Sequence, residues 1–171
     1  MGTHNYIQDQ RNLEILININ GELFKRQEAK ISVFDAGFIL GDGVWEGLRL
    51  HDGVVVFMED HLRRLYQGAM ALDLDIGISK QELSDRVYQT LKANQMNDHV
   101  HIRLMVTRGV KTTPYQDPRA TIPGATIVII PEYKVPSPRK IEGGIKLFTT
   151  HVRRGYPDVQ DQKMNSHSKI N

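Results

Sequence analysis

Hydrophobic and polar residues alternate in short runs along the first third of the chain, a pattern typical of β-strands. The stretch 13–29, LEILININGELFKRQEA, predicts two short strands around Asn20-Gly21, a dipeptide that tolerates the positive φ angles of a type I′ turn. The stretch 48–58, LRLHDGVVVFM, repeats the pattern around Asp52-Gly53. Both stretches therefore predict β-hairpins.

The apolar spacing then changes to three and four residues, which indicates helices that bury one face. In the first helix, which follows residue 58, the buried positions are Leu62, Leu65, Ala69 and Leu72. In the second, they are Leu83, Val87 and Leu91. Ser79 and Glu82 form an S-x-x-E capping box that predicts where the second helix begins.

Strand patterns return in HVHIRLMVTRG (99–109) and ATIVIIPEY (125–133). The proline-containing stretch 135–140, VPSPRK, predicts a linker, and GIKLFTTHV (144–152) predicts a strand of a new unit. We therefore expect an α/β (α+β) fold in which helices pack on a mostly antiparallel sheet. The expected division is a small domain over 1–134, a linker over 135–140 and the start of a large domain over 141–171.

Composition narrows the class of protein. Hydrophobic residues make up 40% of the 171, enough for a packed core, and 22 basic against 20 acidic residues give no support to nucleic-acid binding. The chain has no cysteine, which excludes disulfides and thiolate metal sites, and its seven histidines include no H-x-x-x-H pair, so we expect no metal. No apolar run approaches the roughly 18 residues of a membrane span. We expect a soluble, cytoplasmic protein.

The stretch 37–65, GFILGDGVWEGLRLHDGVVVFMEDHLRRL, carries the strongest chemical signal. Its glycines Gly37, Gly41, Gly43 and Gly47 suit close backbone approach to a ligand. It is not a P-loop, because no Gly-Lys-Ser/Thr follows. On composition alone, the favoured interpretation is a glycine-rich turn that enters a strand.

This stretch resembles the amino-terminal signature of the fold-type IV, pyridoxal-phosphate-dependent aminotransferases. GDGVWEGLRLHDG, an apolar strand and DHLRRLYQGA match the family's G-D-G-aromatic-E run and its H-x-x-R-L helix, and HIRLMVTRG matches the strand that follows. The similarity covers roughly residues 13 to 171, as the first half of a longer protein. The group includes branched-chain and D-amino-acid aminotransferases and aminodeoxychorismate lyase.

The resemblance implies roles for individual residues. Arg64 falls on the arginine that binds the cofactor phosphate, a task that suits a permanently charged fork of donors. Trp45 falls on an aromatic residue that shapes the substrate pocket, and Arg103 on the arginine of the branched-chain enzymes' Y-I-R motif. His101 replaces the tyrosine of that motif and would also face the substrate. Without the resemblance, Arg64 would be a solvated surface charge and Trp45 core or interface filler.

The family also needs one lysine, which bonds to the cofactor aldehyde and then moves a proton between the substrate and the cofactor. The end of the chain, DQKMNSHSKIN, offers Lys169, with Lys163 as the alternative. Aligning the family's D-P-x-x-K-S-x-N run with this stretch places Asn165 at the lysine position, so a chain without the lysine is the third possibility. Ser166 to Lys169 also spells S-x-x-K, but the companion motifs of penicillin-binding folds are absent.

The resemblance thus implies a homodimeric enzyme that uses pyridoxal 5'-phosphate to transfer an amino group between an amino acid and a 2-oxo acid. Branched-chain substrates are expected, because Thr113 and Tyr115 occupy the positions at which the D-amino-acid enzymes carry an arginine and a histidine. Two alternatives stay open: a lyase of the aminodeoxychorismate type with the same cofactor, and a non-catalytic relative that acts as a binding or interaction module.

Overall fold

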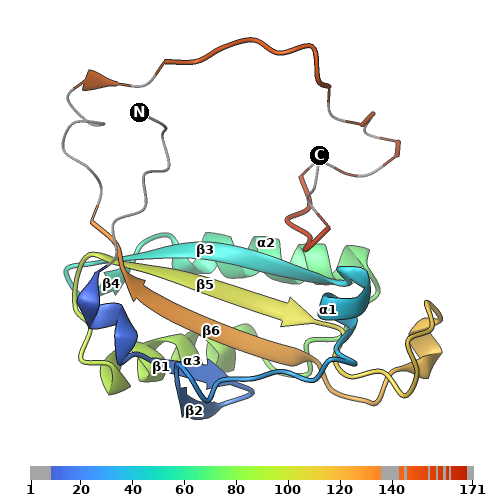
Figure 1. Ribbon diagram of the computed structural model, residues 1–171, viewed down its shortest axis with the longest axis horizontal. Coiled ribbons are helices and arrows are strands. Elements are labelled where there is room, and N and C mark those ends of the chain that lie inside the picture. Colours follow the sequence, from blue (N-terminus) through green and yellow to red (C-terminus); the bar gives the residue numbers. More distant parts are fainter. Residues whose placement is uncertain are drawn as a thin grey trace.

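The computed structural model describes residues 9–135, 143–144, 146–153, 155–156, 158–159, 161 and 163–168. Its centre is a six-stranded antiparallel sheet with the order β2-β1-β6-β5-β3-β4 (Figure 1). The strands are β1 (Leu16–Ile19), β2 (Glu22–Lys25), β3 (Gly43–His51), β4 (Val54–Val55), β5 (Val100–Thr107) and β6 (Thr126–Tyr133). The helices are η1 (Gln10–Leu13), α1 (Ala36–Leu40), α2 (Met58–Ala71), α3 (Lys80–Ala93) and η2 (Pro118–Ala120).

Both predicted hairpins are present, and their turns show why these dipeptides were informative. Asn20 and Gly21 have φ angles of 54° and 95°, and Asp52 and Gly53 have 46° and 78°. Type I′ turns require positive φ at both central residues, and their twist matches that of the flanking strands. The second strand of the second hairpin is short: β4 has two residues, and α2 begins at Met58.

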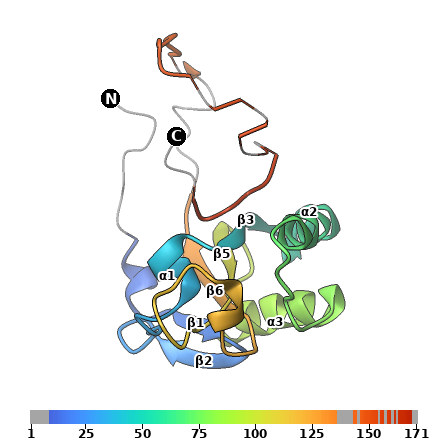
Figure 2. The same ribbon diagram turned by 90° about the vertical axis from the view of Figure 1, so that its right-hand side faces the viewer.

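The two long helices cover one face of the sheet (Figure 2). Alternate residues of the central strands point towards them: Val44, Leu48 and Leu50 of β3, and Val100, Ile102, Leu104 and Val106 of β5. They belong to one core with the predicted helix positions Leu62, Leu65, Ala69, Leu83, Val87 and Leu91. Leu72 is the C-cap of α2 and is only half-buried. The Ser79 hydroxyl accepts from the Glu82 amide at 3.1 Å, so α3 begins where the capping box predicted.

The alternate residues on the other face of β3 and β5 are half-buried and chemically mixed. They are Trp45, Gly47 and Arg49 on β3, and His101, Arg103 and Met105 on β5. Continuous register between the strands brings Gly47 opposite Arg103 and Arg49 opposite His101. We call this the open face of the sheet, since the long helices lie on the opposite side (Figure 2).

The predicted strand over 144–152 is wrong for the residues that the structure describes. Residues 146–152 are extended coil without strand pairing, and Leu147 and Phe148 are 84% and 88% exposed. An alternating pattern shows that a segment can pair, but a strand forms only where a partner strand supplies the hydrogen bonds. Residues 136–140 of the predicted linker lie outside the described residues. Among the helices described, none has the length and apolar character needed to cross a membrane.

Candidate active site

A buried carboxylate joins β3 to α2. Glu46 is 0% exposed and shares the core-facing side of β3 with Val44 and Leu48. Its two oxygens accept from Arg64 Nε at 2.6 Å and from Arg64 Nη2 at 2.5 Å. An ionised carboxylate placed so deeply is stable only with charged partners and saturated hydrogen bonds. The bidentate arginine supplies both.

The neighbouring turn of α2 adds a third bond. His61 Nδ1 lies 2.8 Å from Glu46 Oε2, and because an ionised carboxylate only accepts, Nδ1 carries the proton. His61 and Arg64 are three residues apart and therefore share one face of the helix. Sequence reasoning gave neither Glu46 nor His61 a role. A signal was present: Glu46 interrupts the apolar alternation on the buried side of β3, so a cationic partner was required.

The Arg64 guanidinium is held on one side and free on the other. Nε and Nη2 face Glu46, while the side chain is 52% exposed and lines a cavity of about 530 Å³ between α2 and the residues Asp161, Lys163 and Met164. The hydrogen bond to Glu46, with its negative charge, raises the pKa of Arg64 above its ordinary value despite partial burial. The Arg64 guanidinium therefore stays charged, and its two hydrogen bonds to Glu46 fix its orientation.

The cavity lining suits an anion with several acceptor oxygens. Arg63, Arg64, Gln67 and Lys163 contribute donors, and Gly68 leaves room beside them. The acidic lining residues are Asp60 and Asp161, and Asp60 is paired with Arg63 at 2.6 Å. A phosphate bound here would meet a preformed arginine fork, the arrangement that favours bidentate recognition. The residues present therefore fit the phosphate end of the expected cofactor.

The three residues expected to face the substrate lie together on the open face. Arg103 stacks over Trp45, with 4.1 Å between the guanidinium carbon and the ring centroid. Gly47 lies between Trp45 and His101, and a Cβ there would come within 3.3 Å of His101 Nε2. Burial lowers the pKa of His101 to about 4, with further contributions from the positive charges of Lys134, Arg103 and Arg49. His101 is therefore neutral near pH 7.

Residues 163–168 connect these two regions. Lys163 and Met164 line the Arg64 cavity, and the Ser166 carbonyl accepts from Trp45 Nε1 at 3.1 Å. Asn165 donates to the Trp45 carbonyl at 2.7 Å, so its side chain is used for backbone contact. Lys169 lies outside the described residues, immediately after Ser168.

The glycines of the 37–47 stretch approach other parts of the protein, not open space. A Cβ at Gly37 would lie 2.3 Å from Thr107 Cγ2, one at Gly41 would lie 2.4 Å from Ser168 Oγ, and one at Gly43 would lie 2.5 Å from the Val106 carbonyl oxygen. The expectation that this stretch approaches a ligand is therefore corrected for these three positions. Arg108 has a structural role: it pairs with Asp42 and donates to the Leu72 and Asp73 carbonyls at the end of α2.

A family model described as "Amino-transferase class IV" matches residues 43–168. The chain belongs to this family. Class IV aminotransferases use pyridoxal 5'-phosphate as their cofactor.

Individual class IV relatives agree with this placement. Branched-chain-amino-acid aminotransferase-like protein 1 of Arabidopsis thaliana is 38% identical over 94% of this chain and 29% of its own length. The putative branched-chain-amino-acid aminotransferase of Methanocaldococcus jannaschii is 39% identical over 91% of this chain and 52% of its own. The chain thus spans about half or less of these class IV relatives.

A solved class IV structure confirms the fold. The Escherichia coli branched-chain amino acid aminotransferase has a TM-score of 0.63 and 24% identity over 70% of this chain and 40% of that one. The α/β fold class and the resemblance to fold-type IV enzymes are both confirmed.

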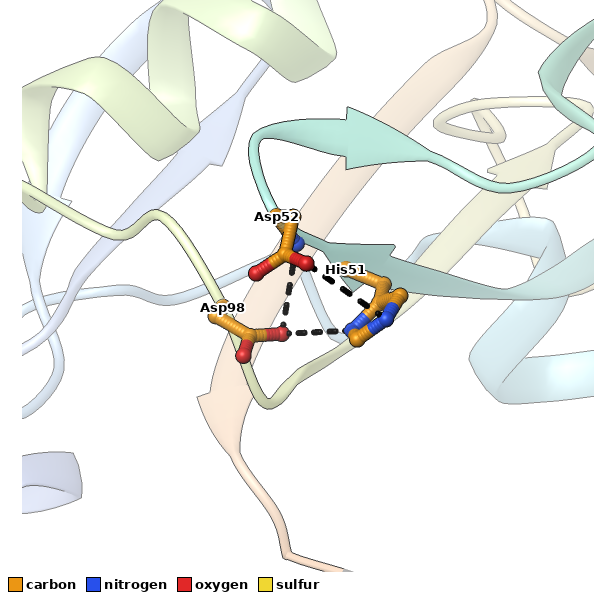
Figure 3. A group of neighbouring side chains, drawn as sticks. All are labelled: His51, Asp52 and Asp98. Atoms are coloured by element: carbon orange, nitrogen blue, oxygen red, sulfur yellow. Dashed lines mark hydrogen bonds and ion pairs between the residues drawn. The ribbon is translucent and has the colours of Figure 1, made fainter.

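Among the described residues, a second group of titratable side chains gathers at the β3–β4 turn, where His51, Asp52 and Asp98 converge (Figure 3). His51 Nδ1 lies 3.0 Å from Asp98 Oδ1, which also accepts from the Asp52 amide at 3.3 Å. The hydrogen bond to Asp98, together with the charges of Asp52 and Asp98, raises the pKa of His51. These are metal-ligating residue types, but here they bond to one another and brace the hairpin against the loop before β5.

We predict that Glu46→Gln lowers the free energy of unfolding by about 1–3 kcal/mol, because an amide N–H would then face the donors of Arg64 or His61. Urea unfolding at neutral pH measures the change. Glu59→Gln is the control, since the Glu59 side chain is 76% exposed and lies 3.9 Å from Lys80. Equal effects of the two substitutions would contradict the assigned role of Glu46.

We also predict that His51 titrates above its ordinary pKa of about 6.5. Because the folded-state pKa is raised, the stability from this pairing is complete below the unfolded-state pKa and is lost as pH rises through the folded one. NMR titration of the His51 ring protons should show the raised pKa in the native chain and a lower pKa in Asp98→Asn, where only the charge of Asp52 still raises it. Asp60→Asn, remote from the turn, should leave the His51 curve in place.

Proposed function

We propose that this chain is the amino-terminal part of an enzyme that uses pyridoxal 5'-phosphate to transfer an amino group between an amino acid and a 2-oxo acid. The observation that carries the proposal is the Arg64 guanidinium, which Glu46 holds on one side so that its other side faces a cation-rich cavity. Branched-chain amino acids are the proposed substrates, supported by the names of the relatives in Arabidopsis and Methanocaldococcus.

The proposed roles follow from the chemistry of each side chain. When bound, pyridoxal 5'-phosphate supplies an aldehyde that bonds amines and a ring that accepts electrons. Arg64 would hold the phosphate through its free N–H groups, and Glu46 and His61 would keep the guanidinium from turning. Lys169 would hold the cofactor through its amine until the substrate amine takes its place, and the freed lysine amine would then carry the proton to and from the substrate Cα.

The open face would form the substrate side. Arg103 is stacked on Trp45 by one face of its guanidinium, which leaves the N–H groups at its edge available to a carboxylate. His101, neutral near pH 7, would offer a hydrogen bond without adding a charge beside an apolar side chain. Gly47 lies between Trp45 and His101, and its missing side chain lets these two side chains approach each other, since a Cβ there would lie 3.3 Å from His101 Nε2 and 3.7 Å from Trp45 Cζ3.

Three further predictions concern the whole protein. The division into a small domain, a linker over 135–140 and the start of a large domain fits the end of β6 at Tyr133. Assembly as a homodimer and a cytoplasmic location remain predictions from the family and the composition.

We predict that Arg64→Lys weakens pyridoxal 5'-phosphate binding about 10- to 100-fold, because the lysine keeps the positive charge but loses one of the two directed hydrogen bonds, worth about 1.5–3 kcal/mol. Equilibrium titration of the cofactor, followed by visible absorbance, measures the change. Arg63→Ala is the matched control, since Arg63 is the adjacent cation and is paired with the exposed Asp60. A larger loss in Arg63→Ala would transfer the phosphate role to Arg63.

We predict that borohydride reduction of the cofactor-loaded protein leaves a stable cofactor adduct on Lys169, because only a lysine bonded to the aldehyde is trapped. Peptide mapping identifies the residue. The adduct should disappear in Lys169→Ala and persist in Lys163→Ala. An adduct on Lys163 would refute the lysine assignment and keep the family. Release of pyruvate from 4-amino-4-deoxychorismate would instead favour the lyase.

A further inference from the structure

We propose that the glycine-rich run Gly41–Trp45 is a docking track for residues 165–168, and that Asn165 is the positioning residue that seats this segment on it. The inference deepens the proposed function and rests on it, since the docked segment ends immediately before Lys169. The run would thereby align the lysine backbone, a task different from the ligand contact that its glycines suggest.

The track lies on a sheet edge that would otherwise be open. On its far side from β5, β3 pairs with β4 through Leu50 and His51 only. At the other end of that edge, Val44 forms an antiparallel bridge with Ser166. Unpaired backbone groups at a sheet edge readily accept another strand. Residues 165–168 occupy this position.

Backbone hydrogen bonds fix the register of the docked segment. The Trp45 amide donates to the Asn165 carbonyl at 2.9 Å, and the His167 amide donates to the Gly43 carbonyl at 2.9 Å. These two bonds flank the bridge between Val44 and Ser166. A register defined at both ends resists sliding by one residue, which would turn every side chain of the segment to the opposite side.

Side chains of both the run Gly41–Trp45 and the segment 165–168 add hydrogen bonds to this contact. Asn165 Nδ2 donates to the Trp45 carbonyl at 2.7 Å, which completes a reciprocal pair with the Trp45 amide. Trp45 Nε1 donates to the Ser166 carbonyl at 3.1 Å, and Ser168 Oγ donates to the Gly41 carbonyl at 3.1 Å. The side chains of Asn165, His167 and Ser168 all bond the track, and Asn165 makes the shortest of these contacts, at 2.7 Å against 3.1 Å for the other two. Asn165 also has no place in the proposed cofactor or substrate contacts.

The glycines explain why the segment can approach so closely. Gly41 has φ of +67°, and a Cβ there would lie 2.4 Å from Ser168 Oγ, far inside contact distance. On the helix side, a Cβ at Gly68 would lie 3.2 Å from Val44 Cγ1 and 3.7 Å from Met164 Cγ. The absence of side chains at Gly41 and Gly68 therefore lets residues 164–168 pack closely between the Arg64 cavity and Trp45.

The docked segment ends at Ser168, which precedes Lys169 in the sequence. Its contacts with Gly41 to Trp45 hold residues 165–168 against β3. Arg64 belongs to the same β3–α2 unit through Glu46. Arg64 and the docked segment are thus both held by β3. Under the proposal this matters because misplacement of a reacting group by about 1 Å can slow a reaction about 100-fold.

The test uses the intact cofactor-loaded protein and compares Asn165→Ala with Asp158→Ala, an exposed substitution earlier in the tail. We expect the Trp45 amide to exchange with deuterium at least tenfold faster in Asn165→Ala. We also expect kcat to fall tenfold or more while KM and cofactor content stay within threefold. Unchanged exchange at Trp45, or a rise in KM with kcat preserved, would overturn the proposal.

A second comparison does not depend on Asn165. Gly41→Ala places a methyl group against Ser168 Oγ, and adding Ser168→Ala removes that oxygen. The kcat of the double variant should be at least fivefold higher than that of Gly41→Ala. The rest of the loss is due to the positive φ at residue 41, which an alanine adopts with strain. No recovery would show that Gly41 acts through its backbone alone and would refute the docking track. If the native protein forms no visible cofactor complex, the proposed enzyme fails, whereas deuterium exchange at Trp45 still decides the docking.

Discussion

The structure depends on one buried charge. Glu46 lies in the core-facing row of β3 between Val44 and Leu48, where an unpaired carboxylate would strongly disfavour folding. Its pairing with Arg64 and His61 makes α2 pack against β3 in one orientation. The same pairing turns the free side of the guanidinium towards the cavity. One interaction thereby pairs the buried carboxylate of Glu46 and presents the Arg64 cation to the cavity.

Much of the fold could be read from local patterns, because local physics determines those parts. Asn20-Gly21 and Asp52-Gly53 specify turns through their backbone freedom, and Ser79 specifies a helix start through its hydroxyl. The strand predicted over 144–152 failed because pairing requires a second strand, which no local pattern reveals. The same limit hid Glu46 and His61, whose role exists only when β3 and α2 meet.

In the candidate site, several of the residues could be predicted from the sequence, but most of their contacts could not. Arg64, Trp45, Arg103 and His101 were found by resemblance, and the structure groups the last three on the open face and places Arg64 beside the cavity. The glycines were noticed for their freedom, but their neighbours could not be foreseen. Gly41 faces Ser168, a residue more than 120 positions later in the chain. Contacts of such range are outside the reach of pattern analysis.

The reciprocal pair between Trp45 and Asn165 has a consequence for biosynthesis. These residues are 120 positions apart, and the sheet strands β3, β5 and β6 all precede Asn165. Because a ribosome releases the amino-terminal part first, the sheet can form before the segment 165–168 emerges. The edge of β3 can therefore be complete before residues 165–168 are available to dock on it.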